Sequence, residues 1–107
     1  MSAEAVAVFA ALGDGVRAQI VERLAREGQV PATSLAEGLP VTRQAVAKHV
    51  LVLRRSGLVA VRKDGRRQMV SLQAEKLDLA QEWLERRARM WETHLAALKA
   101  LVESEGE

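Results

Sequence analysis

The sequence predicts a single, mainly α-helical domain that carries one small β-hairpin. Its 107 residues, 49% of them hydrophobic, are enough for one modest core. Only 3% of the residues are aromatic, so the core must consist largely of Leu, Val and Ala, which favours packed helices. The pair Asp64-Gly65 lies between two short β-type runs and is a strong hairpin signal. We therefore expect one domain over residues 1–107.

The first part of the chain predicts two helices separated by a short break. Apolar residues recur at helical spacing over about residues 3–12 and again over about residues 15–26. Asp14 stands between the two stretches, where its side chain can cap the second helix. A short extended segment is expected next, at residues 30–32.

A helix-turn-helix is expected over about residues 33–56. Thr33 or Ser34 caps a short first helix, and a tight turn follows it. Thr42 caps a longer second helix, which runs from about residue 43 to 56 and ends at Gly57. The apolar side chains of this second helix lie on one face, which leaves its polar side chains for solvent or a partner.

The last part predicts a hairpin and a long helix. Residues 58–61 and 68–72 are β-type runs joined through residues 62–67, which makes a two-stranded wing over about residues 58–72. A long helix follows over about residues 75–103, with apolar residues every three or four positions. This order of elements is that of a winged helix-turn-helix.

The net charge of +2 is distributed very unevenly along the chain. Residues 1–41 carry three basic and five acidic side chains, and residues 68–107 carry five and eight. Residues 42–67, the second helix and the wing, carry eight basic side chains and one acidic. A basic block between acidic flanks indicates a surface for a polyanion, and we expect double-stranded DNA to be the partner.

The second helix has the residue types that read base edges in the major groove. Arg and Lys side chains bond guanine, a Gln side chain bonds adenine, and a helix start suits a phosphate. The candidate DNA-binding residues of this recognition helix are Thr42, Arg43, Gln44, Ala47 and Lys48.

Four basic residues crowd the wing and repel one another unless a polyanion screens them. They are Arg62, Lys63, Arg66 and Arg67. Arginine fits a narrow, A-T-rich minor groove, and we expect Arg66 or Arg67 to occupy it.

The sequence also resembles the ArsR-type (ArsR/SmtB) winged-helix repressors. The resemblance rests on Leu35-Ala36, the stretch from Val41 to Val59, Gly65-Arg66-Arg67 and Leu72. It implies a bacterial homodimer, paired through its first and last helices, that binds an inverted-repeat operator, with its own promoter as one candidate target. Ala47 replaces a serine of many relatives and Leu51 a frequent basic residue, so more of the affinity is expected from the wing.

The last helix is expected to form much of the dimer interface. Its apolar stripe is longer than a monomer of this size easily covers, so part of it should be buried against a second copy. The alternative is that the stripe folds back on its own domain. The expected interface residues are Val8, Leu84, Trp91, Leu95 and Leu98. The tryptophan-bearing end of this helix resembles a metal-independent subgroup of the family.

Other classes of function have little support in the sequence. There is no Cys, and the two histidines, His49 and His94, have no further donors at metal-ligand spacing, so we expect no metal and no cofactor. His49 is interpreted as a packing or hydrogen-bonding residue behind the recognition helix. We find no catalytic motif, export signal or membrane span, and expect a cytoplasmic protein that is not an enzyme. A protein-binding winged helix and a metal-responsive sensor remain alternatives, and any small-molecule effector is unknown.

Overall fold

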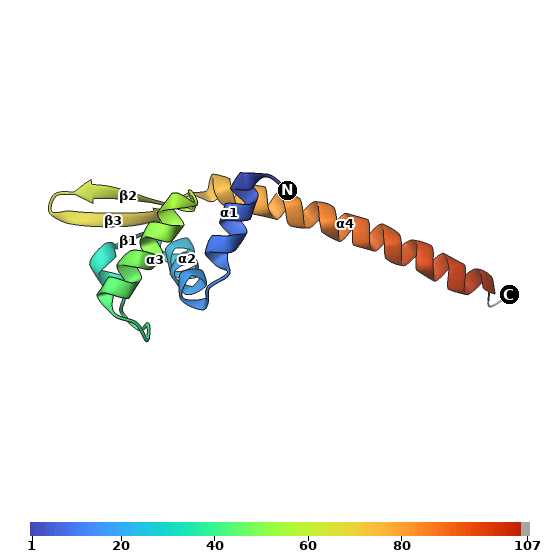
Figure 1. Ribbon diagram of the computed structural model, residues 1–107, viewed down its shortest axis with the longest axis horizontal. Helices are drawn as coiled ribbons and strands as arrows, with labels where there is room; N and C mark the ends of the chain where they lie inside the picture. The colour runs from blue at the N-terminus through green and yellow to red at the C-terminus, as the bar shows by residue number, and fades with distance from the viewer. Residues whose placement is uncertain (106–107) are drawn as a thin grey trace.

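In the computed structural model, which describes residues 1–105, the chain forms a body from which one long helix extends (Figure 1). Residues 106 and 107 of the expected domain lie outside the described residues. The mainly α-helical class with a small antiparallel sheet is confirmed. In chain order the elements are α1 (Ala3–Leu12), α2 (Gly15–Glu27), β1 (Gln29–Pro31), η1 (Ala32–Ser34), α3 (Arg43–Arg55), β2 (Val59–Asp64), β3 (Arg67–Leu72) and α4 (Ala74–Glu105).

Side-chain caps set the starts of three helices. The Ser2 hydroxyl accepts from the backbone N–H of Ala5 at the start of α1. At α2, Asp14 Oδ1 accepts from two backbone N–H groups, at 2.9 and 3.1 Å. Thr42 does the same for α3, at 3.1 Å from Ala45 N. Each cap satisfies helix donors that have no partner within the helix, so the local sequence determines where these helices begin.

The prediction of an α-helix as the first helix of the helix-turn-helix is wrong. η1 is a single 3-10 turn, and the hydrogen bonds after it also join residues three apart, as between Glu37 N and Ser34 O. Gly38 then adopts a positive φ of 77°, and Pro40 disfavours α-helical geometry in the residue before it. Too few residues remain for an α-helix. Leu35, only 1% exposed, still anchors this segment in the core.

The wing is part of a larger sheet than the sequence predicts. The short strand β1 pairs with β3, so the sheet order is β1-β3-β2, with all neighbours antiparallel. Val30 of β1 stands opposite Val70 of β3, and both are almost fully buried. This pairing joins the base of the wing to the body. Beyond β1, the hairpin projects free at the end of the molecule opposite α4 (Figure 1).

The turn of the hairpin is tighter than expected. β2 and β3 pair up to Asp64 opposite Arg67, which leaves only Gly65 and Arg66 as the loop. Gly65 has a φ of 64°, and a glycine at the first loop position is the pattern of a type II′ turn. The basic residues expected in a six-residue connection therefore lie on paired strands, except Arg66 at the tip.

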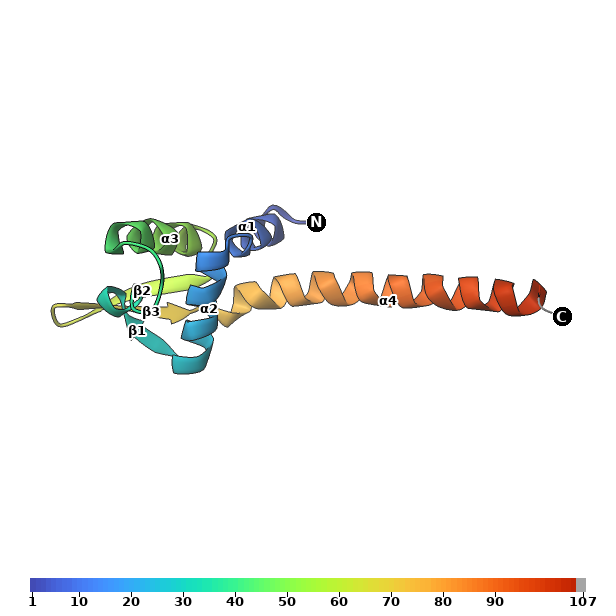
Figure 2. The same cartoon turned by 90° about the horizontal axis from the view of Figure 1, so that it is seen from below.

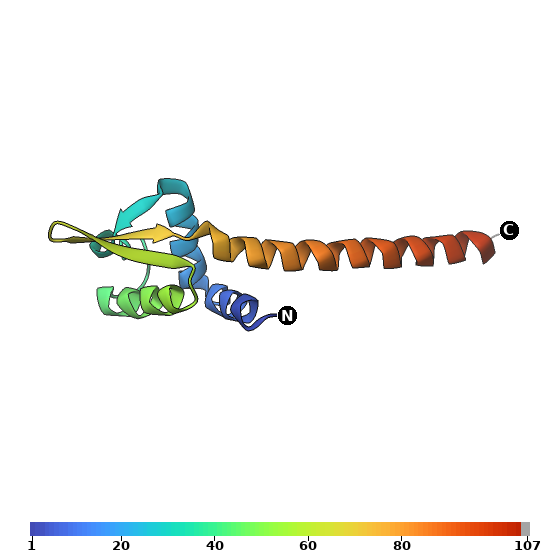
Figure 3. The ribbon, with the colours of Figure 1, turned by 90° about the horizontal axis from the view of Figure 1, so that it is seen from above.

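The core lies where α1, α2 and α3 meet the sheet and the start of α4. Figures 2 and 3 show α3 running beside the hairpin and α1 beside the first turns of α4. The largest fully buried side chains are Ile20, Leu24, Leu35, Leu53, Leu58, Val8, Val30 and Val70. They are all Leu, Ile or Val, as the composition predicts.

α4 leaves this core after its first turns. Ala80 is buried, but every residue from Leu84 to Glu105 is exposed. The helix has 32 residues and is therefore roughly 48 Å long at 1.5 Å per residue. Figure 1 shows its C-terminal part projecting away from the rest of the chain. From Leu84 onward, the apolar stripe does not fold back on its own domain.

Candidate nucleic-acid interface

The recognition helix α3 is fixed in the body by one face and exposed on another. Val46 and Leu53, 3% and 0% exposed, pack into the core, and Val50 is half-buried between them. The residues expected to contact DNA lie away from this face, and all of them are exposed: Thr42, Arg43, Gln44, Ala47 and Lys48. The spacing of the buried positions thus turns the polar side chains outward.

A groove of about 200 Å³ separates α3 from the sheet. Arg43 and Ala47 line its α3 side, together with Leu51. Arg54 and Gln68 also line it, and neither was among the expected DNA-binding residues. Arg54 lies seven residues after Ala47, two helical turns along the same face, so helical spacing was the signal that could have identified it.

Cross-strand register divides the wing cations between the two faces of the hairpin. Lys63 stands opposite Gln68 on the side that faces α3, because residues directly opposite share a face and Gln68 lines the groove. Arg62 and Arg67 lie on the other side, since successive side chains along a strand alternate. Arg66 occupies the turn at the tip. All four cations are exposed.

The Arg and Lys side chains of α3 and the wing are free of carboxylate partners within residues 1–105. The ion pairs found there join other residues, such as Arg23 with Glu27 at 2.6 Å and Arg86 with Glu82 at 2.6 Å. Asp64 is the acidic residue of the wing, and it makes no ion pair at 4 Å or less in the described structure. The cations therefore remain available to an external polyanion.

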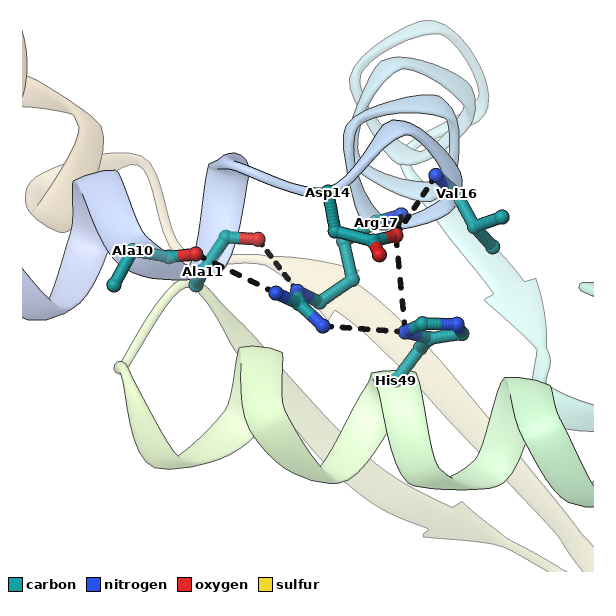
Figure 4. Close-up of polar contacts among 6 residues, drawn as sticks. All are labelled: Ala10, Ala11, Asp14, Val16, Arg17 and His49. Carbon is teal, nitrogen blue, oxygen red and sulfur yellow. Dashed lines mark hydrogen bonds and ion pairs between the residues drawn. The ribbon is translucent and has the colours of Figure 1, made fainter.

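His49 lies on the side of α3 that faces α2, as expected of a hydrogen-bonding residue behind the recognition helix. Its Nδ1 is 3.4 Å from Arg17 Nη1 and 3.9 Å from Asp14 Oδ1 (Figure 4). The side chain is 21% exposed. The part played by Arg17 was not predicted, because its partners lie 6 to 32 residues away along the chain.

The expected dimer residues divide into two groups. Leu84, Trp91, Leu95 and Leu98 are 45 to 58% exposed, unusually high for large apolar side chains. Val8 is 0% exposed and belongs to the core of its own chain, so it offers no surface to a partner. On α1 the exposed apolar residue is instead Val6, at 51%.

The described residues hold no group of three or more His, Cys, Asp or Glu side chains that could bind a metal ion. Over the same range, no helix has both the length and the apolar character that crossing a membrane requires.

Comparison with known proteins places this architecture in a family. A model of a helix-turn-helix domain matches residues 12–62. The HTH-type transcriptional regulator Rv2034 of Mycobacterium tuberculosis is 39% identical over 97 residues, covering 91% of this chain and 87% of that protein. The uncharacterized HTH-type transcriptional regulator YuzN of Bacillus subtilis is 34% identical over 86 residues, covering 74% and 94%.

A solved structure extends the likeness over nearly the whole chain. The ArsR-like transcriptional regulator from Rhodococcus sp. RHA1 superposes with a TM-score of 0.76 at 42% identity, and the match covers 92% of each chain. Sequence and fold therefore agree on DNA-binding transcriptional regulation, with α3 as the second helix of the helix-turn-helix and β2–β3 as the wing. The chain belongs to the ArsR family of winged helix-turn-helix transcriptional regulators.

Proposed function

We propose that this protein is a homodimeric repressor that binds an inverted-repeat operator in the bacterial cytoplasm, with its own promoter as one candidate target. The observation that carries the proposal is the set of exposed Arg and Lys side chains that α3 and the wing carry without ion-pair partners in the described structure. No cofactor is part of the proposal. Each copy places α3 in the major groove and the wing on the flanking DNA.

Sequence readout falls to the first two turns of α3. Arg43 and Lys48 have the donors for guanine O6 and N7, and Gln44 can bond adenine in two places. Thr42, at the start of the helix, lies where a phosphate is favoured. Ala47 contributes an apolar contact, for which a thymine methyl group is the partner. The helix thus has few side chains that contact base edges, which supports a large contribution of the wing to the affinity for DNA.

In this proposal the wing contributes affinity through contacts to the minor groove and to the phosphates. Arg66 is the residue that enters the minor groove in this proposal, because it lies in the turn at the tip of the hairpin. Lys63 faces α3 and suits the phosphates between the two grooves. Arg62 and Arg67, on the side of the hairpin away from α3, add positive charge that attracts DNA as the protein approaches it.

The exposed stripe of α4 supports pairing with a second copy. Its apolar residues alternate four and three positions apart, which is the pattern of a coiled-coil seam. The seam consists of Leu84, Ala88, Trp91, Leu95, Leu98 and Val102. A twofold pairing along it holds two recognition helices in a fixed relation, as an operator with half-sites roughly 34–36 Å apart requires.

Selection from a random DNA pool followed by titration in increasing salt tests this function. We expect an inverted repeat to be selected, and its affinity to fall steeply with salt. Arg66→Ala with Arg67→Ala should reduce the salt slope by about 2, because each lost phosphate contact removes roughly one unit. Gln44→Ala should instead relax the preference at one base pair, a loss of about 1–3 kcal/mol in discrimination.

A double variant of α4, Arg86→Ala with Arg89→Ala, is the matched control because it removes the same charge far from the wing. It should leave the salt slope within error. Absence of salt-dependent DNA binding in the wild-type protein contradicts the proposal and favours the protein-binding alternative.

A further inference from the structure

We propose that Arg17 is a positioning residue for sequence readout: its guanidinium joins the C-terminus of α1 to His49 of α3 and so holds the rotation of the recognition helix. The inference rests on the proposed use of α3 to read bases. Arg17 itself lies in the first turn of α2, is partly buried and touches none of the candidate DNA contacts.

Three donors of one side chain are used on two other helices. Arg17 Nε donates to Ala11 O at 2.7 Å, and Nη2 reaches Ala10 O at 3.4 Å (Figure 4). Nη1 faces His49 Nδ1 at 3.4 Å. The carbonyl groups at the end of a helix have no donor within the helix. Ala10 O also accepts from the N–H of Gly13, whereas Ala11 O takes its donor from Arg17. α1 has no basic residue in its own last turn, and Arg17 takes that place.

The short hydrogen bond to Ala11 O fixes the orientation of the guanidinium plane. In this orientation the Nη1 group of Arg17 faces His49. The guanidinium group carries only donors, so this contact is a hydrogen bond in the tautomer whose Nδ1 accepts. Asp14 Oδ1, held by Val16 N–H and Arg17 N–H, lies 3.9 Å from the same His49 nitrogen. The Nδ1 edge of the imidazole therefore faces both the guanidinium and the carboxylate (Figure 4).

His49 is well placed to control the angle of the reading face. Successive residues of an α-helix are about 100° apart around the axis, so a contact at His49 sets the direction of Lys48 and Gln44. A rotation of α3 by roughly 10° moves its surface by about 1 Å, given a helix radius near 5–6 Å. A displacement of that size disrupts hydrogen bonds to base edges, whereas the electrostatic attraction to phosphates tolerates it. Loss of this contact should therefore reduce specificity more than affinity.

Arg17→Lys is the first test, because it keeps the charge but cannot reach three acceptors on two helices. We measure affinity for the selected operator and for a scrambled duplex at one salt concentration, with thermal unfolding alongside. Operator affinity should fall about 10-fold, as the loss of one charge-assisted hydrogen bond implies, while scrambled-duplex affinity stays within about 2-fold. Arg26→Lys, the same change on an exposed residue of α2, should alter neither.

Substitutions at His49 make the test independent of how well Arg17 variants fold. His49→Leu removes the acceptor and should lower the ratio of operator to scrambled affinity as Arg17→Lys does. His49→Gln keeps an acceptor oxygen and should largely preserve the ratio. Combining Arg17→Lys with His49→Leu should add little to either loss, because both remove the same contact.

Three outcomes overturn the inference. An unchanged ratio in both Arg17→Lys and His49→Leu, with the wild type selective, refutes the positioning role and leaves the proposed function intact. Equal losses on both duplexes show only a structural role. A wild-type protein with no sequence preference contradicts the proposed function, and the positioning role with it.

Discussion

Phe9 of α1 meets Trp83 of α4 edge to face, with ring centroids 5.6 Å apart and an angle of 69° between the planes. The pair lies where α4 leaves the body, and Arg87 covers the indole at 4.6 Å from the ring centroid. Lys76 of α4 also pairs with Glu4 of α1, at 3.2 Å. These contacts fix the direction in which the long helix departs, and hence the position of any second copy relative to α3.

Two replacements of Trp83 measure the contribution of its ring and that of its N–H group separately. Within residues 1–105 the buried Nε1 has no hydrogen-bond partner. Trp83→Phe keeps an aromatic edge contact and removes that unpaired donor, so it should cost little stability. Trp83→Ala should cost about 2 kcal/mol, because it leaves Phe9 without its partner. Urea denaturation measures both, and equal losses would contradict the stabilising role of the aromatic contact with Phe9.

Gly57 is expected to tolerate alanine less well than Gly38. Both have a positive φ, 83° and 77°, so alanine is strained by about 1 kcal/mol at either position. At Gly57 a Cβ would also lie 2.9 Å from Cε and 3.1 Å from Cγ of Lys76, whereas Gly38 has open space. The excess loss at Gly57 should vanish when Lys76→Ala is added. Thermal unfolding of the wild type, the three single variants and the double variant tests this, and an excess that survives Lys76→Ala contradicts it.

The cap of α2 predicts an acid-dependent loss of stability. The pKa of Asp14 is lowered, chiefly by the hydrogen bond from the Arg17 N–H and further by the hydrogen bond from the Val16 N–H and by the charges of Arg17 and His49, while partial burial acts in the opposite direction. A carboxyl group with a lowered pKa in the folded state stabilises the fold above its ordinary pKa, and this contribution disappears as the pH falls through the folded value.

The difference in stability between the wild type and Asp14→Ala should therefore be constant near neutral pH and shrink below about pH 4. Ser2→Ala is the control, because Ser2 caps α1 with an uncharged hydroxyl and its contribution does not titrate in this range. Denaturation at a series of pH values measures both differences. A difference for Asp14→Ala that persists unchanged at the most acidic pH would show that the ionised carboxylate is not what stabilises the cap.

Charge in the seam of α4 should break the dimer without unfolding the chain. Leu95→Glu and Trp91→Glu change side chains that are 45% and 58% exposed, so the core loses nothing. A glutamate on each copy places like charges in an apolar interface, and sedimentation should show a monomer. Thr93→Glu, on the opposite side of the helix, should remain a dimer. A dimer in all three variants places the interface elsewhere.

Much of the candidate site could be read from the sequence because its signals are local. Thr42 and Asp14 cap the helices that they precede, and the 3.6-residue period separates buried Val46 and Leu53 from the exposed basic residues. The composition of residues 42–67 likewise located the basic surface before its shape was known.

The errors arose where segments far apart in the sequence meet. The pairing of β1 with β3 depends on a strand that follows some 40 residues later, which no local period reveals. Val8 was expected at a dimer interface because the first helix was expected to take part in pairing. The packing of α1 against α4 and the body instead buries the Val8 side chain.

The sequence by itself determined the helices, the hairpin and the residue types of the basic surface, because capping, periodicity and charge act over a few residues. Only the tertiary structure decided which wing cation faces α3, how far α4 projects, and that Arg17 reaches both α1 and His49. Those relations come from long-range strand register and side-chain reach, and they exist only after the chain has folded.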